Sequence, residues 1–457
     1  MTEPVKQETR QGRLKTLTTA LATALESGGA LVNARKMLNS LHPSEIAHLL
    51  ESVPPRERTL AWELVDAELE GDVLSHAGDE VRASLLRLMD THELVAATEG
   101  METDDLADIL QDLPRVVIRT VLQSMDEQDR QRVEAVLSYP EDTAGGLMNT
   151  DTITVRPDVT LDVVLRYLRR RGEIPETTDS LIVVTRADQY IGLLSLADLL
   201  TQDPSLAVAE VMMRDVEGIP ATLPAGEVAN LFEQLDLISA PVINDAGQLL
   251  GRITIDDVVD VIRDEAEHSL MSMAGLHEEE DIFAPVIVSA RRRAVWLGIN
   301  LMTAFLASWV IGLFEATIEK IVALAVLMPI VASMGGIAGS QTVTLVIRGM
   351  ALGRVGAANA KHVVMKELAV GALNGILWAA VVAAVASVWY KDYRIGAIIA
   401  AAMAINLITA ALVGATLPLL LRRMGADPAL AGSVVLTTVT DVIGFMSFLG
   451  LATVFLI

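Results

Sequence analysis

A single carboxylate stands inside a long apolar stretch near the C-terminus, where its charge could attract a cation. Asp441 is the one charged residue of residues 428–457. A charged side chain at membrane depth costs several kcal/mol unless it faces water, protein or an ion, so it marks a functional site by default. The other long apolar stretches hold no Lys, Arg or His that could neutralise it. We interpret Asp441 as a cation ligand; the alternative is a protonated Asp hydrogen-bonded within a helix bundle.

Further carboxylates gather in two segments outside the apolar stretches. Asp256, Asp260 and Asp264 recur every four residues, which puts them on one face of a helix. A second acidic face comprises Asp104, Asp105, Asp108 and Asp112. Hard divalent cations prefer oxygen ligands and can bridge carboxylates of two domains, which turns repulsion into attraction. A solvated acidic surface is the alternative interpretation.

Backbone carbonyls could complement Asp441. Pro329 removes a backbone donor, and Gly335, Gly336 and Gly339 are expected to loosen the same apolar helix before Ser340. Irregular backbone at membrane depth is stable only where it is buried in protein or lines a water-filled path. Carbonyls freed there would line a pore for a hard cation together with Asp441. Glycines also permit close helix contact, which is the alternative.

The charge distribution shows where these residues must be positioned. The chain has 457 residues, 52% of them hydrophobic, and a formal net charge of -24. Residues 1–290 hold 23 basic and 53 acidic side chains, whereas residues 291–457 hold 12 and 6. This asymmetry predicts an acidic soluble region joined to a membrane domain. The absence of Cys excludes disulfide-stapled folds and thiolate metal sites, and the acidity excludes nucleic-acid binding that relies on overall positive charge.

Five stretches are long and apolar enough to cross a membrane: 294–314, 321–347, 368–390, 395–421 and 428–457. Nine Lys or Arg flank them on one side and three on the other. An excess of basic residues marks the cytoplasmic side, which predicts a cytoplasmic N-terminal region and an extracytoplasmic C-terminus in a cell membrane. The N-terminus has no apolar signal core, so we expect the acidic part to stay in the cytoplasm.

Residues 31–139 favour short amphipathic helices separated by turns. The segment 44–54 (SEIAHLLESVP) is similar to the segment 104–114 (DDLADILQDLP), at an offset of 60. Recurring helix pairs must bury one apolar stripe against their neighbours, which predicts an α-helical superhelix. Residues 1–30 are expected to form an N-terminal extension.

Residues 140–263 contain a second duplication. GLLSLADLL at 192–200 aligns with GRITIDDVV at 251–259, at an offset of 59. Strand-like and helical patterns alternate here, and the two units resemble a tandem pair of CBS domains. The resemblance implies that Ser195, Asp198, Thr254 and Asp257 could hold an adenine nucleotide such as ATP. Simple helix capping by Ser195 and Thr254 is the alternative, and the residues themselves favour it.

From roughly residue 30 to its end, the chain resembles the MgtE family of magnesium channels and transporters. The motifs that carry this resemblance are YPEDTAGGLM (139–148), the CBS pair, the acidic connector, PIVASMGGIAGSQ (329–341) and DPALAGSVVLTTVTDVIG (427–444). It implies a homodimer with a central magnesium pore, closed when cytosolic magnesium binds the acidic domains and holds the connector, or plug, helices. The expected domains are the helical N domain (31–139), the tandem CBS domains (140–263), the plug helix (256–290) and the five-helix transmembrane domain (291–457).

The resemblance also implies roles for individual acids. Asp441 matches the pore carboxylate, and Asp427 matches the acid that opens the fifth helix. Three positions match acids of the plug helix: Asp257, Asp260 and Glu265. The remaining implied magnesium ligands are Asp236 in the second CBS unit and, by a looser match, Asp104 and Asp108 in the N domain.

Some positions depart from the family pattern. Ile337 and Ser433 stand where Asn is usual, and His268 and Ser269 replace acids of the plug helix. Residues 223–226 (LPAG) replace a segment in which acids are common. With fewer sensor carboxylates, we expect a weaker or differently placed response to magnesium.

Two other functions stay open at this point. A carrier could exchange a divalent cation for sodium or protons, or the spans could merely anchor an adenylate sensor. An enzyme is disfavoured because the seven His are scattered and no nucleophile–base spacing is present. Nucleic acid is not an expected partner.

Overall fold

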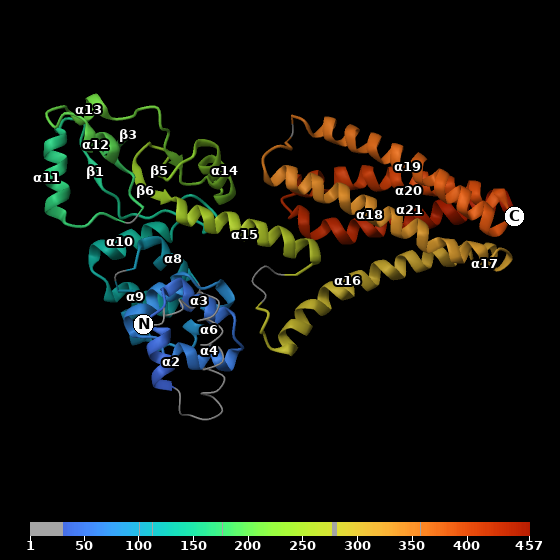
Figure 1. Cartoon of the computed structure of the whole chain (residues 1–457), viewed down its shortest axis with the longest axis horizontal. Helices are drawn as coiled ribbons and strands as arrows, with labels where there is room; N and C mark the ends of the chain where they lie inside the picture. The colour runs from blue at the N-terminus through green and yellow to red at the C-terminus, as the bar shows by residue number, and fades with distance from the viewer. Residues whose placement is uncertain (1–30, 100, 112, 176, 277–280, 357) are drawn as a thin grey trace, which may run out of the picture. The chain divides into compact units, whose positions relative to one another are not determined.

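The computed structural model describes residues 31–99, 101–111, 113–175, 177–276, 281–356 and 358–457 (Figure 1). The extension expected over residues 1–30 and Asp112 of the acidic face lie outside these ranges. The side chains of Ser269 and Ser433 are likewise outside the described part. The chain forms two compact units. The first unit comprises the residues up to Glu265 and the separate segment 281–284. The second unit comprises the segment that begins at Ala266 and residues Pro285–Ile457.

Short helices open the first unit because Pro, Asp and His side chains start them repeatedly. Pro43 and Pro55 occupy first turns, where the missing N–H costs little. Asp90 and Asp126 accept backbone N–H bonds at two further starts. The helices are α2 (Leu31–Leu38), α3 (Pro43–Glu51), α4 (Pro55–Trp62), α5 (Ala67–Ser75), α6 (Asp79–Leu86), α7 (Thr91–Ala97), α8 (Thr103–Gln111), α9 (Arg115–Ser124) and α10 (Glu127–Val136).

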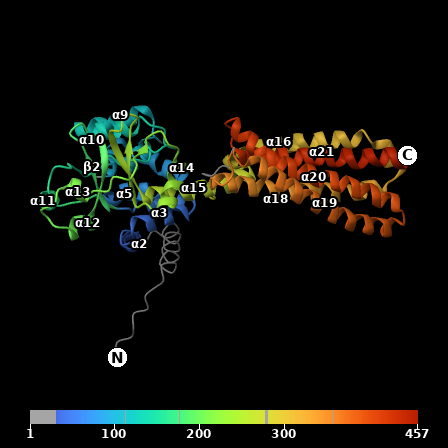
Figure 2. The ribbon, with the colours of Figure 1, turned by 90° about the horizontal axis from the view of Figure 1, so that it is seen from above.

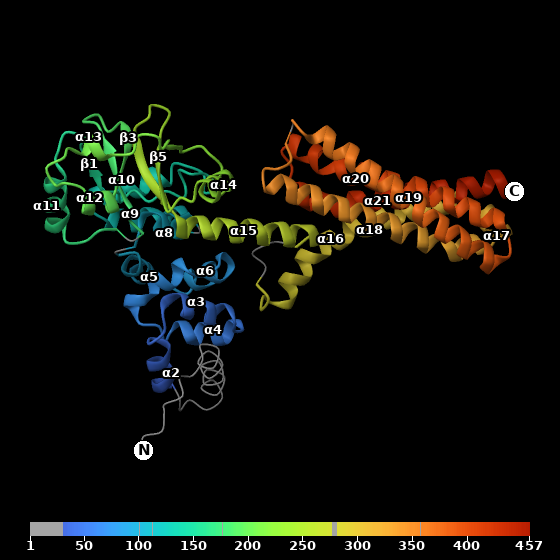
Figure 3. The same cartoon turned by 45° about the horizontal axis from the view of Figure 1, so that its top comes forward.

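These helices stack in the manner of a repeat protein (Figure 3). Helix α3 packs on α5, α5 on α7 and α7 on α9, and α8 packs on α10, so contacts between alternate helices recur along the domain. The similar segments seen in the sequence are α3 and α8, whose bounds both differ by 60 residues. Their apolar faces join a buried core that includes Ile46, Leu50 and Ile109. The helical superhelix is confirmed.

Two matching three-stranded sheets follow. The strands are β1 (Thr154–Val155), β2 (Ser180–Val184), β3 (Tyr190–Ser195), β4 (Ile219–Pro220), β5 (Ser239–Ile243) and β6 (Leu249–Thr254), in the orders β1-β2-β3 and β4-β5-β6. In each sheet the first pairing is parallel and the second antiparallel. Ser180 pairs with Ser195, and Ser239 pairs with Thr254, so the registers repeat at the offset of 59. The duplication predicted for the CBS pair is confirmed.

Four helices, α11 (Leu161–Arg171), α12 (Leu196–Thr201), α13 (Val208–Val211) and α14 (Ala225–Leu235), lie between the strands. Helix α15 (Ile255–Ala274) follows β6 directly. The connector was expected over residues 256–290, but its helix ends at Ala274. Gly275, at φ 70°, adopts a conformation that side-chain-bearing residues rarely enter, and a side chain there would overlap Trp296.

The second unit contains α16 (Val286–Gly312), the short α17 (Glu315–Lys320), α18 (Ala323–Ala351), α19 (Ala360–Tyr390), α20 (Tyr393–Arg423) and α21 (Pro428–Leu456). Five of them are long and apolar enough to cross a membrane, which confirms the five spans predicted from the sequence. Helices α18, α19, α20 and α21 lie alongside one another (Figure 2). Helix α20 is the most buried of the five, which places it at the centre of the bundle.

The prediction that the glycines loosen the second span is wrong. Helix α18 is continuous from Ala323 to Ala351, with Pro329 inside it. The glycines instead admit neighbouring helices: a methyl group at Gly335 would overlap Asn406 of α20, and one at Gly339 would lie 2.7 Å from Leu436 of α21. Close packing, the alternative interpretation, explains these two glycines.

Candidate functional site

Asp441 lies well inside α21, and its side chain is half-buried. The hydroxyls of Thr437, Thr438 and Thr440 around it donate to carbonyls of their own helix, so they do not bind the carboxylate. Within the described ranges, Asp441 has no hydrogen bond or ion pair. A carboxylate of this kind in an apolar helix retains its capacity to attract a cation.

Two contacts place Asp441 relative to α18. A methyl group at Gly339 would touch Leu436 of α21, and one at Gly444 would lie 3.3 Å from Val331. The helices are therefore antiparallel, and Asp441 lies level with the turn of α18 that contains Gly335 and the neighbouring Gly336. The structure thus places Asp441 at the same level of the helix bundle as the glycine-rich segment.

Asp427 caps the N-terminus of α21 and also contacts the end of α15. Its Oδ1 accepts the N–H of Ala429 at 2.8 Å, and its Oδ2 lies 3.2 Å from His268 Nε2. Ser272 Oγ lies 3.4 Å from the same His nitrogen. Met273 packs on Val343 and its neighbours in the same cluster. His268, which the sequence marks only as a lost acid, is therefore a direct partner of Asp427.

Carboxylates of α8 face carboxylates at the start of α15 within the first unit. Burial and the neighbouring Asp257 hold the pKa of Asp104 well above its ordinary value. Burial, with Asp256 beside it, raises the pKa of Asp257 to about 7, although Thr254 Oγ1 donates to Asp257 Oδ2 at 2.9 Å. Burial also raises the pKa of Asp105. Asp104 and Asp257 thus lie near enough for their charges to interact, which the magnesium-bridge hypothesis requires.

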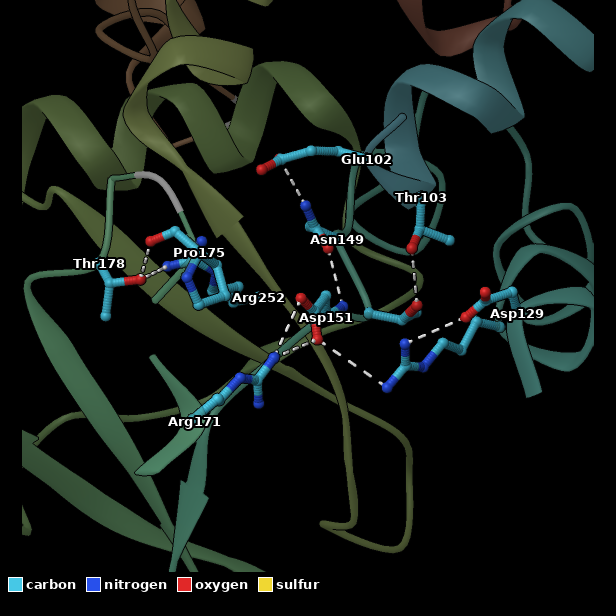
Figure 4. Close-up of polar contacts among 11 residues, drawn as sticks. Glu102, Thr103, Asp129, Asn149, Asp151, Arg171, Pro175, Thr178 and Arg252 are labelled. Atoms are coloured by element: carbon cyan, nitrogen blue, oxygen red, sulfur yellow. Dashed lines mark hydrogen bonds and ion pairs between the residues drawn. The ribbon is translucent and has the colours of Figure 1, made fainter. Parts of the chain in front are cut away.

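A polar network holds α8 against the CBS pair (Figure 4). Asn149 Nδ2 donates to Glu102 at 2.6 Å, and Thr150 Oγ1 donates to Thr103 Oγ1 at 3.2 Å. These contacts join residues 47 positions apart, and Asn149 also pairs with Arg252 of β6, so the first turn of α8 lies beside β6. The acid pair Asp104 and Asp257 is therefore built on a defined contact between N domain and CBS pair.

The other predicted sensor acids have different surroundings. Burial raises the pKa of Asp108 to about 7, with Arg82 acting to lower it and Glu141 to raise it. Asp260 pairs with Arg263 at 3.1 Å, and Arg263 also reaches Asp264 at 3.3 Å. Arg263 thus offsets much of the repulsion expected along this face, which the sequence interpretation overlooked.

Asp236 and the carboxylate of Glu265 lie at opposite ends of α14. Asp236 is exposed and ends α14 in a left-handed conformation, at φ 52°. The carboxylate of Glu265 lies against Gly226, in the first turn of α14, where a methyl group would overlap it. A carboxylate is favoured at a helix N-terminus, whose N–H groups carry partial positive charge. Gly226, which replaces an expected acid, therefore makes room for Glu265.

The two hydroxyls considered for nucleotide binding have different local partners. Ser195 Oγ accepts the N–H of Ala197 at 3.1 Å, at the start of α12, whose first turn contains Asp198. Thr254 donates to Asp257 at the start of α15. Ser195 therefore caps a helix, as the capping interpretation predicts, whereas the Thr254 hydroxyl bonds the Asp257 side chain instead.

No three His, Asp or Glu side chains within the described ranges are grouped to hold one metal ion. Magnesium nevertheless fits a pair of acids, because it retains several waters and commonly binds through one or two carboxylates. Asp104 and Asp257, whose charges interact, are the candidate pair.

The raised pKa values predict a pH-dependent stability of the cytosolic part. Because Asp108 and Asp257 bind protons more tightly when folded, their favourable contribution is complete below pH 4 and is lost as the pH rises through about 7. We expect a fragment of residues 1–284, in chelator, to lose more stability between pH 4 and 7 than its Asp108→Asn, Asp257→Asn variant, by about 3 kcal/mol for each carboxyl. Urea unfolding at several pH values measures this difference. Parallel pH curves for the two proteins would contradict it.

A buried ion pair that the sequence did not suggest ties the segment before α16 to the N domain. Arg58 Nη2 lies 2.7 Å from Asp281 Oδ2, and the two side chains are only 4% and 7% exposed. Arg58 Nε also donates to the carbonyl of Leu50, and the N–H of Asp281 donates to Glu80. The N domain therefore holds the residues that lead into the first span.

Replacing Arg58 by Met leaves the Asp281 carboxylate buried without its cation. We expect a loss of about 3 kcal/mol in the unfolding free energy of the 1–284 fragment. Arg35→Met is the matched control, because the Arg35–Asp66 pair is 57% and 49% exposed and its loss should cost at most about 1 kcal/mol. Equal losses in the two variants, measured by urea unfolding, would exclude a tightly held segment.

Comparison with known proteins agrees with this architecture. Residues 41–142 match the MgtE intracellular N domain, residues 144–204 and 208–264 match CBS domains, and residues 328–451 match MgtE, a divalent cation transporter. The match to an intracellular domain supports the cytosolic placement of the N-terminal part predicted from the basic residues. The five apolar helices support a multi-pass membrane protein.

Similar proteins span nearly the whole chain. The magnesium transporter MgtE of Thermus thermophilus is 31% identical over 442 residues, which cover 95% of this chain and 98% of that protein. The magnesium transporter MgtE of Bacillus subtilis is 26% identical and covers 94% and 95%, respectively.

Two solved structures resemble the cytosolic part. The cytosolic domain of the Mg²⁺ channel MgtE in complex with ATP is 33% identical, with a TM-score of 0.48, and covers 53% of this chain and 99% of its own. The soluble part of a magnesium transporter is 22% identical, with a TM-score of 0.47, and covers 56% and 100%. With a full-length relative above 30% identity and matches to every part of the fold, the chain belongs to the MgtE family of magnesium transporters.

Proposed function

We propose that this transporter is a channel, in which magnesium moves down its electrochemical gradient past Asp441 and in which cytosolic magnesium closes the pore. The observation that carries the proposal is the half-buried Asp441, without a counter-charge among the described residues and level with the glycine-rich turn of α18. A lone carboxylate in an apolar helix favours a cation path over a structural ion pair.

The chemistry of this site suits a hard, hydrated ion. A carboxylate oxygen is the ligand that magnesium prefers, and the ion gives up its waters reluctantly. One carboxylate beside a small-residue turn could hold a hydrated ion electrostatically without stripping it, which allows both entry and release. The family assignment supplies magnesium as the transported ion.

Gating in this proposal begins at Asp104 and Asp257. Without a cation, burial first and neighbouring carboxylates second raise the pKa of both groups, so it costs free energy to keep them charged. A magnesium ion between them would replace repulsion with attraction and hold α15, which runs on into the second unit. Asp108, Asp236, Asp260, Glu265 and Asp427 are the further candidate ligands implied by the family resemblance.

Two direct contacts made by α15 lead us to expect that fewer bound magnesium ions are needed to hold this helix in the closed state. Glu265 meets the N-terminus of α14 at Gly226, and His268 meets Asp427. Each is a favourable contact at a position where the family resemblance leads one to expect paired acids. A helix held partly by such contacts should close with fewer bound ions, so the magnesium response is weaker or differently placed.

Three finer points belong to the same proposal. The channel is a homodimer, as the family resemblance implies, and its C-terminus is extracytoplasmic, as the basic residues predict. ATP binding at the CBS pair stays a proposal on Ser195, Asp198, Thr254 and Asp257, and the gating scheme does not require it.

Magnesium uptake into liposomes containing the purified protein separates a channel from an exchanging carrier. With sodium absent and the pH equal on both sides, we expect uptake to follow the magnesium gradient and the membrane potential. Uptake that requires an opposing sodium or proton gradient would favour the carrier. Comparing cobalt, manganese and calcium in the same vesicles would define the selectivity.

A further inference from the structure

One buried amide contacts two neighbouring helices at the level of Asp441. Asn406, in α20, has an exposed fraction of 0%. Its Nδ2 donates to the carbonyl of Val331 in α18 at 2.8 Å, across 75 positions of the sequence. Its Oδ1 is buried and has no hydrogen-bond partner within the described part of the chain. An unpaired buried oxygen costs about 1–3 kcal/mol, so the amide calls for an explanation beyond packing.

Glycines on two helices make room for this amide. A methyl group at Gly335 of α18 would overlap the Asn406 side chain, and one at Gly444 of α21 would lie 2.8 Å from its Nδ2. Since the amide is fully enclosed, it cannot turn away from an added methyl group at low cost. The spacing of α18, α20 and α21 therefore depends on one amide between two glycines.

This contact lies beside the proposed ion path. Gly444 follows Asp441 by three residues, slightly less than one helical turn, so the two share a side of α21. Gly335 belongs to the turn of α18 that lies level with Asp441. A displacement of either helix at Asn406 would thus change the distance between Asp441 and α18.

We propose that Asn406 is a positioning residue of the ion path. It sets the separation of α18 from α21 at the level of Asp441, through its hydrogen bond to Val331 and its fit between Gly335 and Gly444. This role rests on the proposed function of Asp441. Leu has nearly the shape of Asn and no polar atoms, and it would fill the site without an unpaired oxygen. The amide therefore contributes a directional hydrogen bond to Val331, called the tether below, and not only side-chain volume.

The fit of Asn406 against Gly335 is tested by adding a methyl group on α18 and then removing side-chain atoms on α20. Gly335→Ala alone should reduce magnesium uptake into liposomes about tenfold, because the methyl group displaces α18. Adding Asn406→Ala removes the overlapping atoms and should restore uptake to within about threefold of wild type. Gly371→Ala is the matched control: its methyl group would meet Ala411 on the other side of α20, so Asn406→Ala should not restore it.

The tether is tested separately by Asn406→Leu. We expect an unchanged or higher melting temperature, because the unpaired oxygen is gone, together with an uptake lowered about threefold, as in the double variant, because both proteins lack the hydrogen bond to Val331. A packing role alone would leave uptake unchanged. This variant also keeps the proposal testable if Gly335→Ala does not fold.

The outcomes separate this proposal from the role of Asp441. If Asp441→Asn in the same vesicles takes up magnesium normally, the proposed pore fails, whatever the exchange shows. If Asp441→Asn is inactive but the folded double variant is no faster than Gly335→Ala, only the positioning role of Asn406 is overturned. Wild-type uptake by Asn406→Leu overturns the tether in the same way.

Discussion

Replacing Asp441 by Asn should reduce magnesium uptake at least about tenfold, since even 1.4 kcal/mol of lost ion attraction corresponds to that factor. The substitution keeps the shape of the side chain and removes only its charge. An amide at the same place attracts a divalent cation far less, while the removal of a half-buried charge should not destabilise α21. Ion flux into liposomes, with the melting temperature measured in parallel, provides the comparison.

Asp392→Asn is the control for that experiment. Asp392 is another carboxylate of the second unit, but it caps the N-terminus of α20, where Arg394 donates its N–H at 2.8 Å. Asn caps helices as well as Asp does, so this variant should transport at the wild-type rate. Equal uptake by wild type and folded Asp441→Asn would refute the pore role of Asp441.

The second large effect is expected at the interface of α8 and α15. A double variant, Asp104→Asn with Asp257→Asn, removes the repulsion and also the ligands for a bridging cation. We expect the 1–284 fragment to be more stable in chelator than wild type and to resist protease without magnesium. The additional protection conferred by magnesium should fall about tenfold, because the proposed bridge contributes it.

Limited proteolysis across a magnesium titration measures this change. Asp162→Asn serves as control, because Asp162, in α11, pairs with Arg166 at 2.9 Å and is exposed, so its loss should alter the titration little. A double variant that responds to magnesium as wild type does would place the sensor elsewhere among the acids. Full wild-type protection at sub-millimolar magnesium would itself count against a weakened response.

Much of the architecture could be predicted from the sequence because its signals are local. Apolar length predicts each span, and the offset of 59 between CBS units reappears as the same strand register in both sheets. The candidate pore residue was found because a charge in an apolar helix is rare and expensive. Capping of Ser195 likewise follows from a hydroxyl placed just before a helix.

The failures involve partners distant in the sequence. From the sequence, Gly335 was expected to loosen its helix, whereas in the structure it makes room for Asn406 of another helix. From the sequence, His268 was interpreted only as the replacement of an acid, whereas in the structure it contacts Asp427, 159 positions away. Arg58 gives no sign of its buried partner, because Asp281 follows 223 residues later. A single sequence carries no signal for such pairings, since neither residue type nor spacing indicates which distant segment will face it.

The central claim is a magnesium current that cytosolic magnesium itself suppresses. Its most direct measurement is the current through membrane patches that contain the full-length protein, with no sodium and equal pH on both sides, as magnesium on the cytosolic face is raised. We predict a magnesium-carried current that decreases as cytosolic magnesium increases. A current that is unaffected by cytosolic magnesium, or that is absent until a sodium or proton gradient is supplied, would contradict the proposed channel.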